Sequence, residues 1–131
     1  MNNLEINEEY DFLVGIVNED ANIENILKSL DKVKFLRFFR DIKAKKELNI
    51  DFETIFEEMK NKNVILEILS KPNNLLSEVL IRAAINKGVK ISIVSGAKNK
   101  KELSFIKYGV NQARRGWAES KDVINVRDNP F

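Results

Sequence analysis

The sequence of 131 residues contains no cysteine and no histidine. Without cysteine, the chain cannot form a disulfide, use a thiol as a nucleophile, or hold zinc or an iron–sulfur cluster through thiolates. Without histidine, it lacks the side chain that most often acts as a general base near neutral pH and most often ligates transition metals. Any metal site would therefore depend on oxygen ligands alone, which favour magnesium, calcium or manganese.

Long apolar runs are absent as well, and no stretch approaches the roughly 20 residues needed to cross a bilayer. Residues 1–5 show no basic segment followed by an apolar one, as a signal peptide would. We therefore expect a cytoplasmic protein that does not contact a membrane.

The net charge is only +2, but the charges are unevenly distributed, and basic residues are missing from the beginning of the chain. Residues 1–25 contain seven acidic and no basic side chains, giving −7, whereas residues 82–131 contain eleven Lys or Arg and four acidic side chains, giving +7. A basic C-terminal half favours phosphate-rich partners such as RNA or DNA. The alternative is an ordinary charged and solvated surface.

The composition, 44% hydrophobic and 32% charged, suits one soluble globular domain spanning residues 1–131. Runs rich in Val, Ile, Leu and Phe predict strands at 12–17, 33–39, 64–69 and 89–94. Nearly continuous apolar runs of this length are typical of parallel strands that are buried on both faces.

Helical patterns lie between and after these runs, at 22–30, 51–62, 74–87, 102–113 and 119–124. Asp51 is a plausible N-cap of the second helix, Asn73 or Asn74 of the third, and Gly88 should end the third. Strands alternating with helices predict an α/β fold. Two architectures fit, either a partial (βα) barrel or an open, mostly parallel four-stranded sheet with helices on both faces.

Four strands do not close a barrel, so the sheet should have uncovered edges. Such edges invite pairing, which predicts a homo-oligomer or a partner protein that covers them. Residues 40–49 form the one irregular, highly charged stretch and are expected to be a loop.

The C-terminal part carries a recognisable motif. Residues 108–117 read YGVNQARRGW, and residues 121–125 read KDVIN. They resemble the closing segment of PHP (polymerase and histidinol phosphatase) domains, above all those of family X DNA polymerases and stand-alone phosphoesterases, where the pattern is YGV-x-x-ARRGW followed by KEDVINT. Residues 11–18, 66–69, 88–93 and 95–98 are similar, in the same order, to the DxVIGSVH, LEIN, GVKISI and SDAH segments of that family. The resemblance covers nearly the whole chain but only the later strands of a seven-stranded barrel, because the HxHT and SDG motifs have no counterpart.

The metal-binding positions of that pattern are all changed. Asn18 replaces a histidine, Phe38 or Phe39 stands where an HP pair should end the second strand, Gly96 replaces the aspartate of SDAH, and Lys98 replaces its histidine. Leu69 replaces the asparagine of LEIN, which is not itself a usual ligand. Glycine and phenylalanine donate no lone pair, and a lysine ammonium repels a metal ion. The resemblance therefore implies a chain with no metal, no cofactor and no catalytic residue, which favours a protein that is not an enzyme.

Three functions remain open on this basis. The first is a non-catalytic PHP-like module that acts as a scaffold or interaction subunit. The second is a module that binds nucleic acid or phosphate, by analogy with the PHP-like protein subunit of ribonuclease P, which also lacks the metal ligands. The third is a phosphoesterase whose ligands come from a partner chain.

The candidate residues for phosphate or nucleic-acid binding are cationic. Active sites of parallel α/β proteins lie at the carboxyl ends of the strands, where several of these cations are expected, and the alternative is again a solvated surface. The candidates are Arg37, Arg40, Lys98, Lys100, Lys101, Arg114 and Arg115.

Two further residues lead to expectations. Glu67 lies within an apolar strand and needs a buried partner, for which Arg37 or one of the pair Arg114 and Arg115 is expected. Trp117 is expected to pack over the bottom of the sheet, with a stacking platform for a nucleobase as the alternative.

Overall fold

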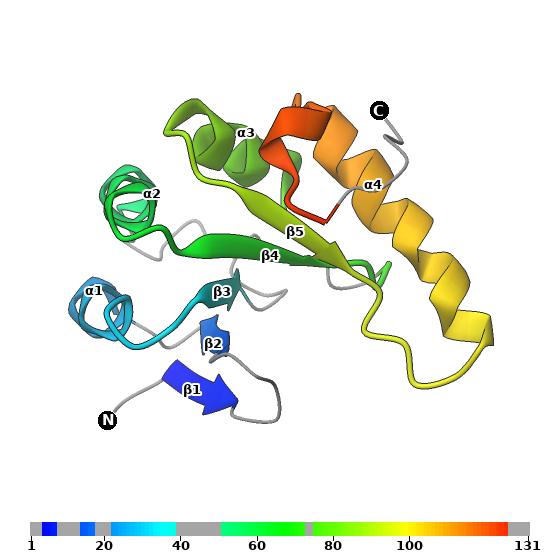
Figure 1. Ribbon diagram of the computed structural model, residues 1–131, viewed down its shortest axis with the longest axis horizontal. Helices are drawn as coiled ribbons and strands as arrows, with labels where there is room; N and C mark the ends of the chain where they lie inside the picture. The colour runs from blue at the N-terminus through cyan, green and yellow to red at the C-terminus, as the bar shows by residue number, and fades with distance from the viewer. Residues whose placement is uncertain (1–3, 8–13, 18–21, 39–50, 73–74, 126–131) are drawn as a thin grey trace.

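The computed structural model describes residues 4–7, 14–17, 22–38, 51–72 and 75–125. Five strands form one sheet, and their spatial order is their order in the sequence (Figure 1). The strands are β1 Leu4–Asn7, β2 Val14–Val17, β3 Phe35–Phe38, β4 Ile65–Leu69 and β5 Ile91–Val94. Strands β2 to β5 are parallel to one another, so the expected four-stranded parallel sheet is confirmed.

Strand β1 was not expected from the sequence. It pairs antiparallel with β2, and Leu4 lies opposite Val17. Four residues between acidic and amide side chains are too short a run to produce a clear periodic signal. The sheet is therefore mixed, with the antiparallel strand at its edge.

The two faces of the sheet differ in chemistry because successive side chains of a strand point to opposite faces. One face is apolar and almost inaccessible to water; its described residues in the last three strands are Leu36, Phe38, Leu66, Ile68, Ile91 and Ile93. The other face carries a polar row, in which Arg37 lies beside Glu67 and Glu67 lies beside Ser92. The strands are thus not apolar on both faces.

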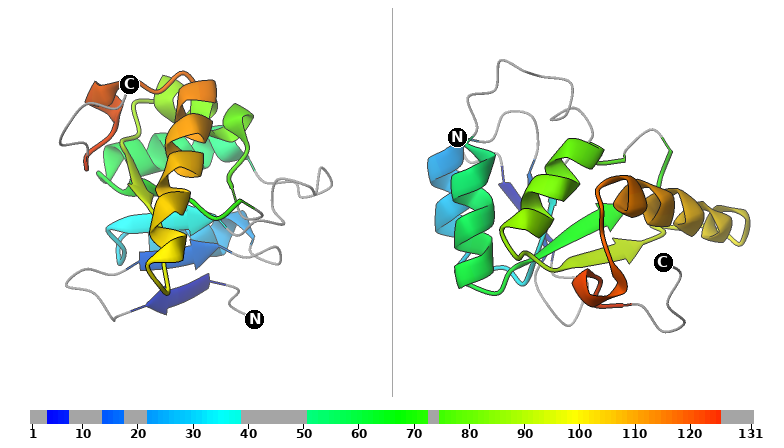
Figure 2. Two further views of the ribbon diagram at one scale, coloured as in Figure 1. Left: turned by 90° about the vertical axis from the view of Figure 1, so that its right-hand side faces the viewer. Right: turned by 90° about the horizontal axis from the view of Figure 1, so that it is seen from above.

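The described helices cover the apolar face. They are α1 Ile23–Ser29, α2 Phe52–Asn61, α3 Glu78–Asn86 and α4 Ile106–Arg115, and neighbours in this series are in contact (Figure 2). Phe38 of β3 meets Phe56 of α2 with ring centroids 6.2 Å apart, and Gly109 of α4 lies against Ile93 of β5. Helices on one face and strands in sequential order are the arrangement of a (βα) barrel segment, not of a sheet with helices on both faces.

The N-termini of the helices follow local hydrogen-bonding rules. Asp51 caps α2 as predicted, since its carboxylate accepts from the Thr54 amide at 3.1 Å and from the Thr54 hydroxyl at 2.6 Å. The third helix starts later than predicted, at Glu78, because Ser77 accepts from the Val79 amide at 3.2 Å and is its N-cap. Residues 73 and 74, the caps expected from the sequence, lie outside the described residues.

Three helices end in the same way. In each case a residue with positive φ is followed by an amide that bonds back to the carbonyl five residues earlier, which is the Schellman arrangement. The residue with positive φ is Asn63 after α2 (56°), Gly88 after α3 (85°) and Trp117 after α4 (68°). Glycine and asparagine are usual there, whereas tryptophan is not, because its Cβ crowds the backbone in this conformation.

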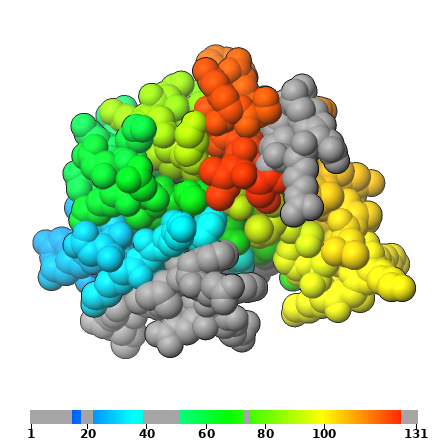
Figure 3. Space-filling view, viewed as in Figure 1, coloured from blue at the N-terminus to red at the C-terminus, as the bar shows by residue number. Residues whose placement is uncertain are grey.

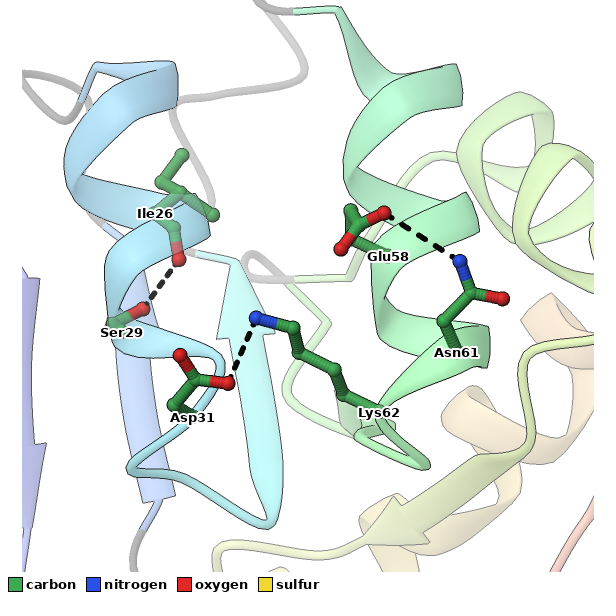
Figure 4. Close-up of polar contacts among 6 residues, drawn as sticks. All are labelled: Ile26, Ser29, Asp31, Glu58, Asn61 and Lys62. Atoms are coloured by element: carbon green, nitrogen blue, oxygen red, sulfur yellow. Dashed lines mark hydrogen bonds and ion pairs between the residues drawn. The ribbon is translucent and has the colours of Figure 1, made fainter.

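The C-terminal ends of α1 and α2 are tied by exposed polar contacts (Figure 4). Lys62, the residue that follows α2, makes an ion pair of 2.8 Å with Asp31, which follows α1. Within α1, the Ser29 hydroxyl donates to the Ile26 carbonyl at 2.6 Å. An exposed ion pair of this kind contributes little stability, about 0–1 kcal/mol, so the packing of the helices on the sheet dominates.

The last part of the chain covers the outer edge of β5. The predicted helix 102–113 is present as a 3₁₀ turn Lys101–Phe105 that continues into α4, but the predicted helix 119–124 is wrong. Only a short 3₁₀ turn, Ser120–Asp122, forms, and Val123 then bridges to Ile91. No helix within the described residues is long and apolar enough to span a bilayer.

Candidate functional site

The carboxyl ends of the parallel strands are where the resemblance places the altered ligand positions. Strand β4 ends at Leu69 and β5 ends at Val94, two residues before Gly96. Gly96 has a φ of 61°, and a Cβ atom added to it would overlap Cδ1 of Leu69. A residue with a side chain would thus be strained at position 96 and would also have to displace the end of the Leu69 side chain.

One lysine side chain lies close to this point, and a second lysine follows it in the sequence. The side chain of Lys71 also lies close to Gly96, with its Cε 3.4 Å from the position of the added Cβ. Lys98 is exposed, and its backbone amide donates to the carboxylate of Glu102 at 3.0 Å. The described residues contain no group of three or more acidic side chains that could hold a metal ion.

Phe38 does not belong to this site. Its side chain points to the helix-covered face and stacks edge-on against Phe52 and Phe56 of α2. Phe38 is therefore a core residue, and its correspondence to a former ligand position remains a prediction. Asn18, Phe39 and Arg40 lie outside the described residues.

Arg37 and Glu67 form an ion pair on the helix-free face, by which we mean the face of the sheet that none of the described helices covers. This contact confirms Arg37 as the expected partner. Nη2 of Arg37 lies 3.0 Å from Oε2 of Glu67, and its Nε–H donates to the same oxygen at 3.1 Å. The side chains are 22% and 9% exposed, respectively. Because its guanidinium is already paired, Arg37 is less suited to bind a phosphate than the sequence suggested.

The remaining cationic candidates form two separate groups. Lys98, Lys100 and Lys101 are exposed and precede α4, whereas Arg114 and Arg115 are exposed at its end. A helix of ten residues holds the two groups roughly 15 Å apart. Figure 3 shows this separation, with the yellow segment before α4 projecting at the right and the orange-red segment after α4 at the top.

Trp117 does not pack over the bottom of the sheet. Its side chain is 66% exposed and lies beside α3, where the guanidinium carbon of Arg82 is 3.9 Å from the ring centroid. Nη2 of Arg82 also donates to the carbonyl of Arg115 at 3.3 Å. Sequence reasoning missed Arg82, because only the fold brings residues 82 and 117 together.

Gly116 explains why the two helices meet at this point. A Cβ atom added to Gly116 would overlap the side chain of Ile81 in α3. The glycine is therefore required for close packing of the turn on α3, and it is not the residue with positive φ. The left-handed position falls on Trp117, where it costs about 1–2 kcal/mol relative to glycine.

A different hollow lies at the amino ends of the strands. It measures about 200 Å³, and its walls include Lys60, Val64, Lys90 and Ile124. Lys90 is already engaged, since its ammonium donates to the carbonyl of Lys121 at 2.8 Å. This hollow is at the opposite end of the sheet from the altered ligand positions.

One curated protein shares a segment with this chain. DNA polymerase/3'-5' exonuclease PolX of Bacillus subtilis (strain 168) is 36% identical over 80 residues, which is 60% of this chain but 14% of that protein. No family model matches the chain. The chain is thus similar to a small part of a family X DNA polymerase, and the shared segment spans far less than the length of that protein.

Proposed function

We propose that this chain is a non-catalytic, polymerase-related module that acts as a scaffold or interaction subunit. The observation that carries the proposal is the contact between Gly96 and Leu69. Where the PHP pattern has an aspartate, the chain has an exposed glycine with a φ of 61°, and the end of the Leu69 side chain lies where a Cβ atom would be. Neither glycine nor leucine has a side-chain oxygen that could bind a metal ion.

Electrostatics acts in the same direction. Lys71 and Lys98 bring two ammonium groups to the carboxyl ends of β4 and β5. A divalent cation is bound by carboxylates, carbonyls and neutral imidazoles, and nearby ammonium groups repel it. Repurposing of this end of the sheet is therefore more consistent with the residues present than weakened catalysis.

The helix-free face of the sheet is the surface that we propose for docking, and the proposed occupant is a second copy of the chain. Its polar row contains both an arginine and a glutamate, and it is flanked by the half-buried Ile65, Leu69 and Val94. Arg37 and Glu67 pair within the chain, and Glu67 is buried. In a two-fold symmetric interface, the contact between copies would therefore be made by these three apolar side chains.

Light scattering on the purified chain tests this role. We expect a dimer, and we expect Val94→Lys, which places a cation on the helix-free face, to convert it to a monomer. The matched control is Glu57→Lys on the exposed side of α2, which should leave the dimer intact. A monomeric wild-type chain, or equal behaviour of the two variants, would exclude self-docking through this face.

Nucleic-acid binding is the second candidate, favoured by the exposed Lys98, Lys100 and Lys101. Binding through phosphates releases counterions, so affinity should fall steeply with salt. Replacing all three lysines by glutamine should weaken binding to all sequences alike and reduce the salt dependence. Absence of binding to RNA and DNA at low salt would remove this candidate.

Completion of a phosphoesterase by a partner chain is not supported by the edge of β5. The amide of Ile124 donates to the carbonyl of Ile91 at 2.9 Å, and the side-chain amide of Asn125 makes two hydrogen bonds to Ile93. A partner strand can add to β5 only by displacing these residues. We therefore do not propose this function.

A further inference from the structure

Trp117 occupies a position that its own backbone disfavours. The two equivalent helix ends have asparagine and glycine, which tolerate positive φ, at positions 63 and 88. The ring of Trp117 gains little burial in exchange, because two thirds of its surface stays exposed. An exposed aromatic side chain held in a strained conformation is a candidate for function.

The contact with Arg82 does not explain the choice of tryptophan. An exposed cation–π contact typically stabilises by less than a left-handed backbone costs a residue that has a Cβ atom. The contact does fix the orientation of the ring. Arg82 covers the ring with its guanidinium 3.9 Å from the centroid and is itself anchored to the Arg115 carbonyl.

We infer that Trp117 and Arg82 form a platform on which an unpaired base of a single-stranded nucleic acid stacks. Every nucleobase has a flat π surface, and stacking on an exposed aromatic side chain is the usual way in which proteins hold single strands. The guanidinium group of Arg82 contacts the ring, and Arg114 and Arg115 are exposed shortly before Trp117 in the sequence. Cations of this kind attract the flanking phosphates.

The surroundings favour a nucleic acid over a protein partner. A tryptophan that anchors a protein interface usually sits within a rim of other side chains that exclude water. Here the ring contacts a cation, Arg82, and α4 ends with two more cations, Arg114 and Arg115. Among the exposed aliphatic residues, Val79 is the nearest to Arg82 in the sequence, and it lies about one turn before Arg82 on α3.

This site is separate from the lysine group that precedes α4 and does not depend on the scaffold role. Roughly 15 Å of helix lies between the two groups of cations. Base stacking at Trp117 and phosphate binding at Lys98, Lys100 and Lys101 can therefore be removed one at a time. This separation makes the inference testable independently of the second candidate function.

Tryptophan fluorescence gives a direct readout, because Trp117 is the only tryptophan in the chain. Titration of the whole chain with a short oligothymidylate at low salt is expected to quench the emission in a saturable way. An abasic oligomer of equal length and inorganic tripolyphosphate supply the charge without the bases, and neither should quench to the same extent.

Three variants separate stacking from folding. Trp117→Gly relieves the backbone strain, so it should fold at least as stably as the wild type while its affinity for a labelled oligothymidylate, measured by anisotropy, falls about tenfold or more. Trp117→Phe retains an aromatic face and should recover part of the affinity. Leu103→Ala, at another exposed apolar side chain, is the matched control and should bind like the wild type.

The inference is overturned if Trp117→Gly binds the oligomer as tightly as the wild type, or if the wild type binds none. Equal quenching by the abasic oligomer would also overturn it, because charge alone would then account for binding. If Trp117→Gly instead changes the oligomeric state seen by light scattering, the platform binds protein and the assignment to nucleic acid is wrong. The inference is supported if Trp117→Gly also lowers the affinity in a chain whose three lysines have been replaced by glutamine.

Discussion

Gly96 and Leu69 share one small volume at the carboxyl end of the sheet. The positive φ of Gly96 strains any other residue at this position, and such a residue would also have to displace the Leu69 methyl group that lies where its Cβ would be. The two positions depend on each other, since the leucine can be accommodated because residue 96 is a glycine. Sequence comparison with the PHP pattern identified both changes but gave no indication that they are in contact.

This coupling predicts the outcome of a double-mutant cycle. Gly96→Ala should lower the free energy of unfolding by more than the roughly 1–2 kcal/mol expected from the backbone alone, because Cβ overlaps Leu69. Adding Leu69→Ala should remove the overlap, so that the double variant loses about 0.5–3 kcal/mol less than the sum of the single changes. Urea denaturation measures both quantities. Strict additivity would show that the contact is not a constraint, and Lys98→Ala serves as an exposed control.

Other single residues were predictable to different degrees. Glu67 was recognised as a charge inside an apolar strand, and its partner Arg37 was among the candidates because it occupies the neighbouring strand. The exposure of Trp117 was not predictable, because hydrophobicity favours burial and only the position of the turn on α3 prevents it. The contact of Trp117 with Arg82 is likewise a product of tertiary structure.

Helix boundaries illustrate how local chemistry competes with periodicity. The second helix begins where an aspartate can cap it, and the prediction was accurate. The third begins at a serine because Ser77 provides the cap, although the apolar pattern continues upstream to Leu75 and Leu76. The predicted helix at 119–124 fails because the edge of β5 offers hydrogen bonds that a helix would forgo.

The cap of α2 predicts a pH effect at the same scale. The hydroxyl of Thr54, and then its amide, donate to Asp51 and hold the pKa of that carboxyl below its ordinary value of 3.8. A lowered folded pKa means that the stabilisation is complete above pH 3.8 and is lost as the pH falls through the folded pKa. Asp51→Asn keeps an oxygen acceptor but does not titrate.

The unfolding free energies of the wild type and Asp51→Asn should therefore differ most near neutral pH and converge in acid. Thermal or urea unfolding of both chains between about pH 6 and about pH 2 gives the comparison. A difference that stays constant over this range, or that grows in acid, would show that the charge of Asp51 does not stabilise the helix.

The edge of β5 gives a second prediction for an element. The Asn125 side chain accepts from the Ile93 amide at 3.2 Å and donates to its carbonyl at 2.6 Å, which imitates a neighbouring strand. Asn125→Ala should cost about 1–2 kcal/mol, from two lost hydrogen bonds, and should increase aggregation through the exposed edge. Asn111→Ala, on the exposed side of α4, is the control. A variant that is as stable and as soluble as the wild type would show that Asn125 does not protect the edge.

At the scale of the whole molecule, the parallel direction of the four strands followed from alternating apolar runs and helical stripes, but their order did not. The choice between the two architectures did not follow from the sequence, because the pattern of apolar residues does not reveal which face a helix will cover. Register decides it: Arg37, Glu67 and Ser92 fall into one row, and the helices take the other face. The antiparallel edge strand was missed because it is short.

Similarity to a segment of PolX relates the chain to a polymerase, and the end of the sheet at which parallel α/β proteins hold their sites carries Leu69, Lys71 and Lys98. A module that has lost its metal site should bind no metal ion, whereas an enzyme that has changed its ligands should still bind one. Metal content is therefore the property in which the two differ most.

The most direct measurement is the metal content of the purified chain after exposure to Mn²⁺ and Zn²⁺ and removal of free ions, read by inductively coupled plasma mass spectrometry together with hydrolysis of a nitrophenyl phosphodiester. We predict that metal remains far below one ion per chain and that hydrolysis does not exceed the protein-free rate. Stoichiometric Mn²⁺ or Zn²⁺, accompanied by hydrolysis that a chelator abolishes, would contradict the account.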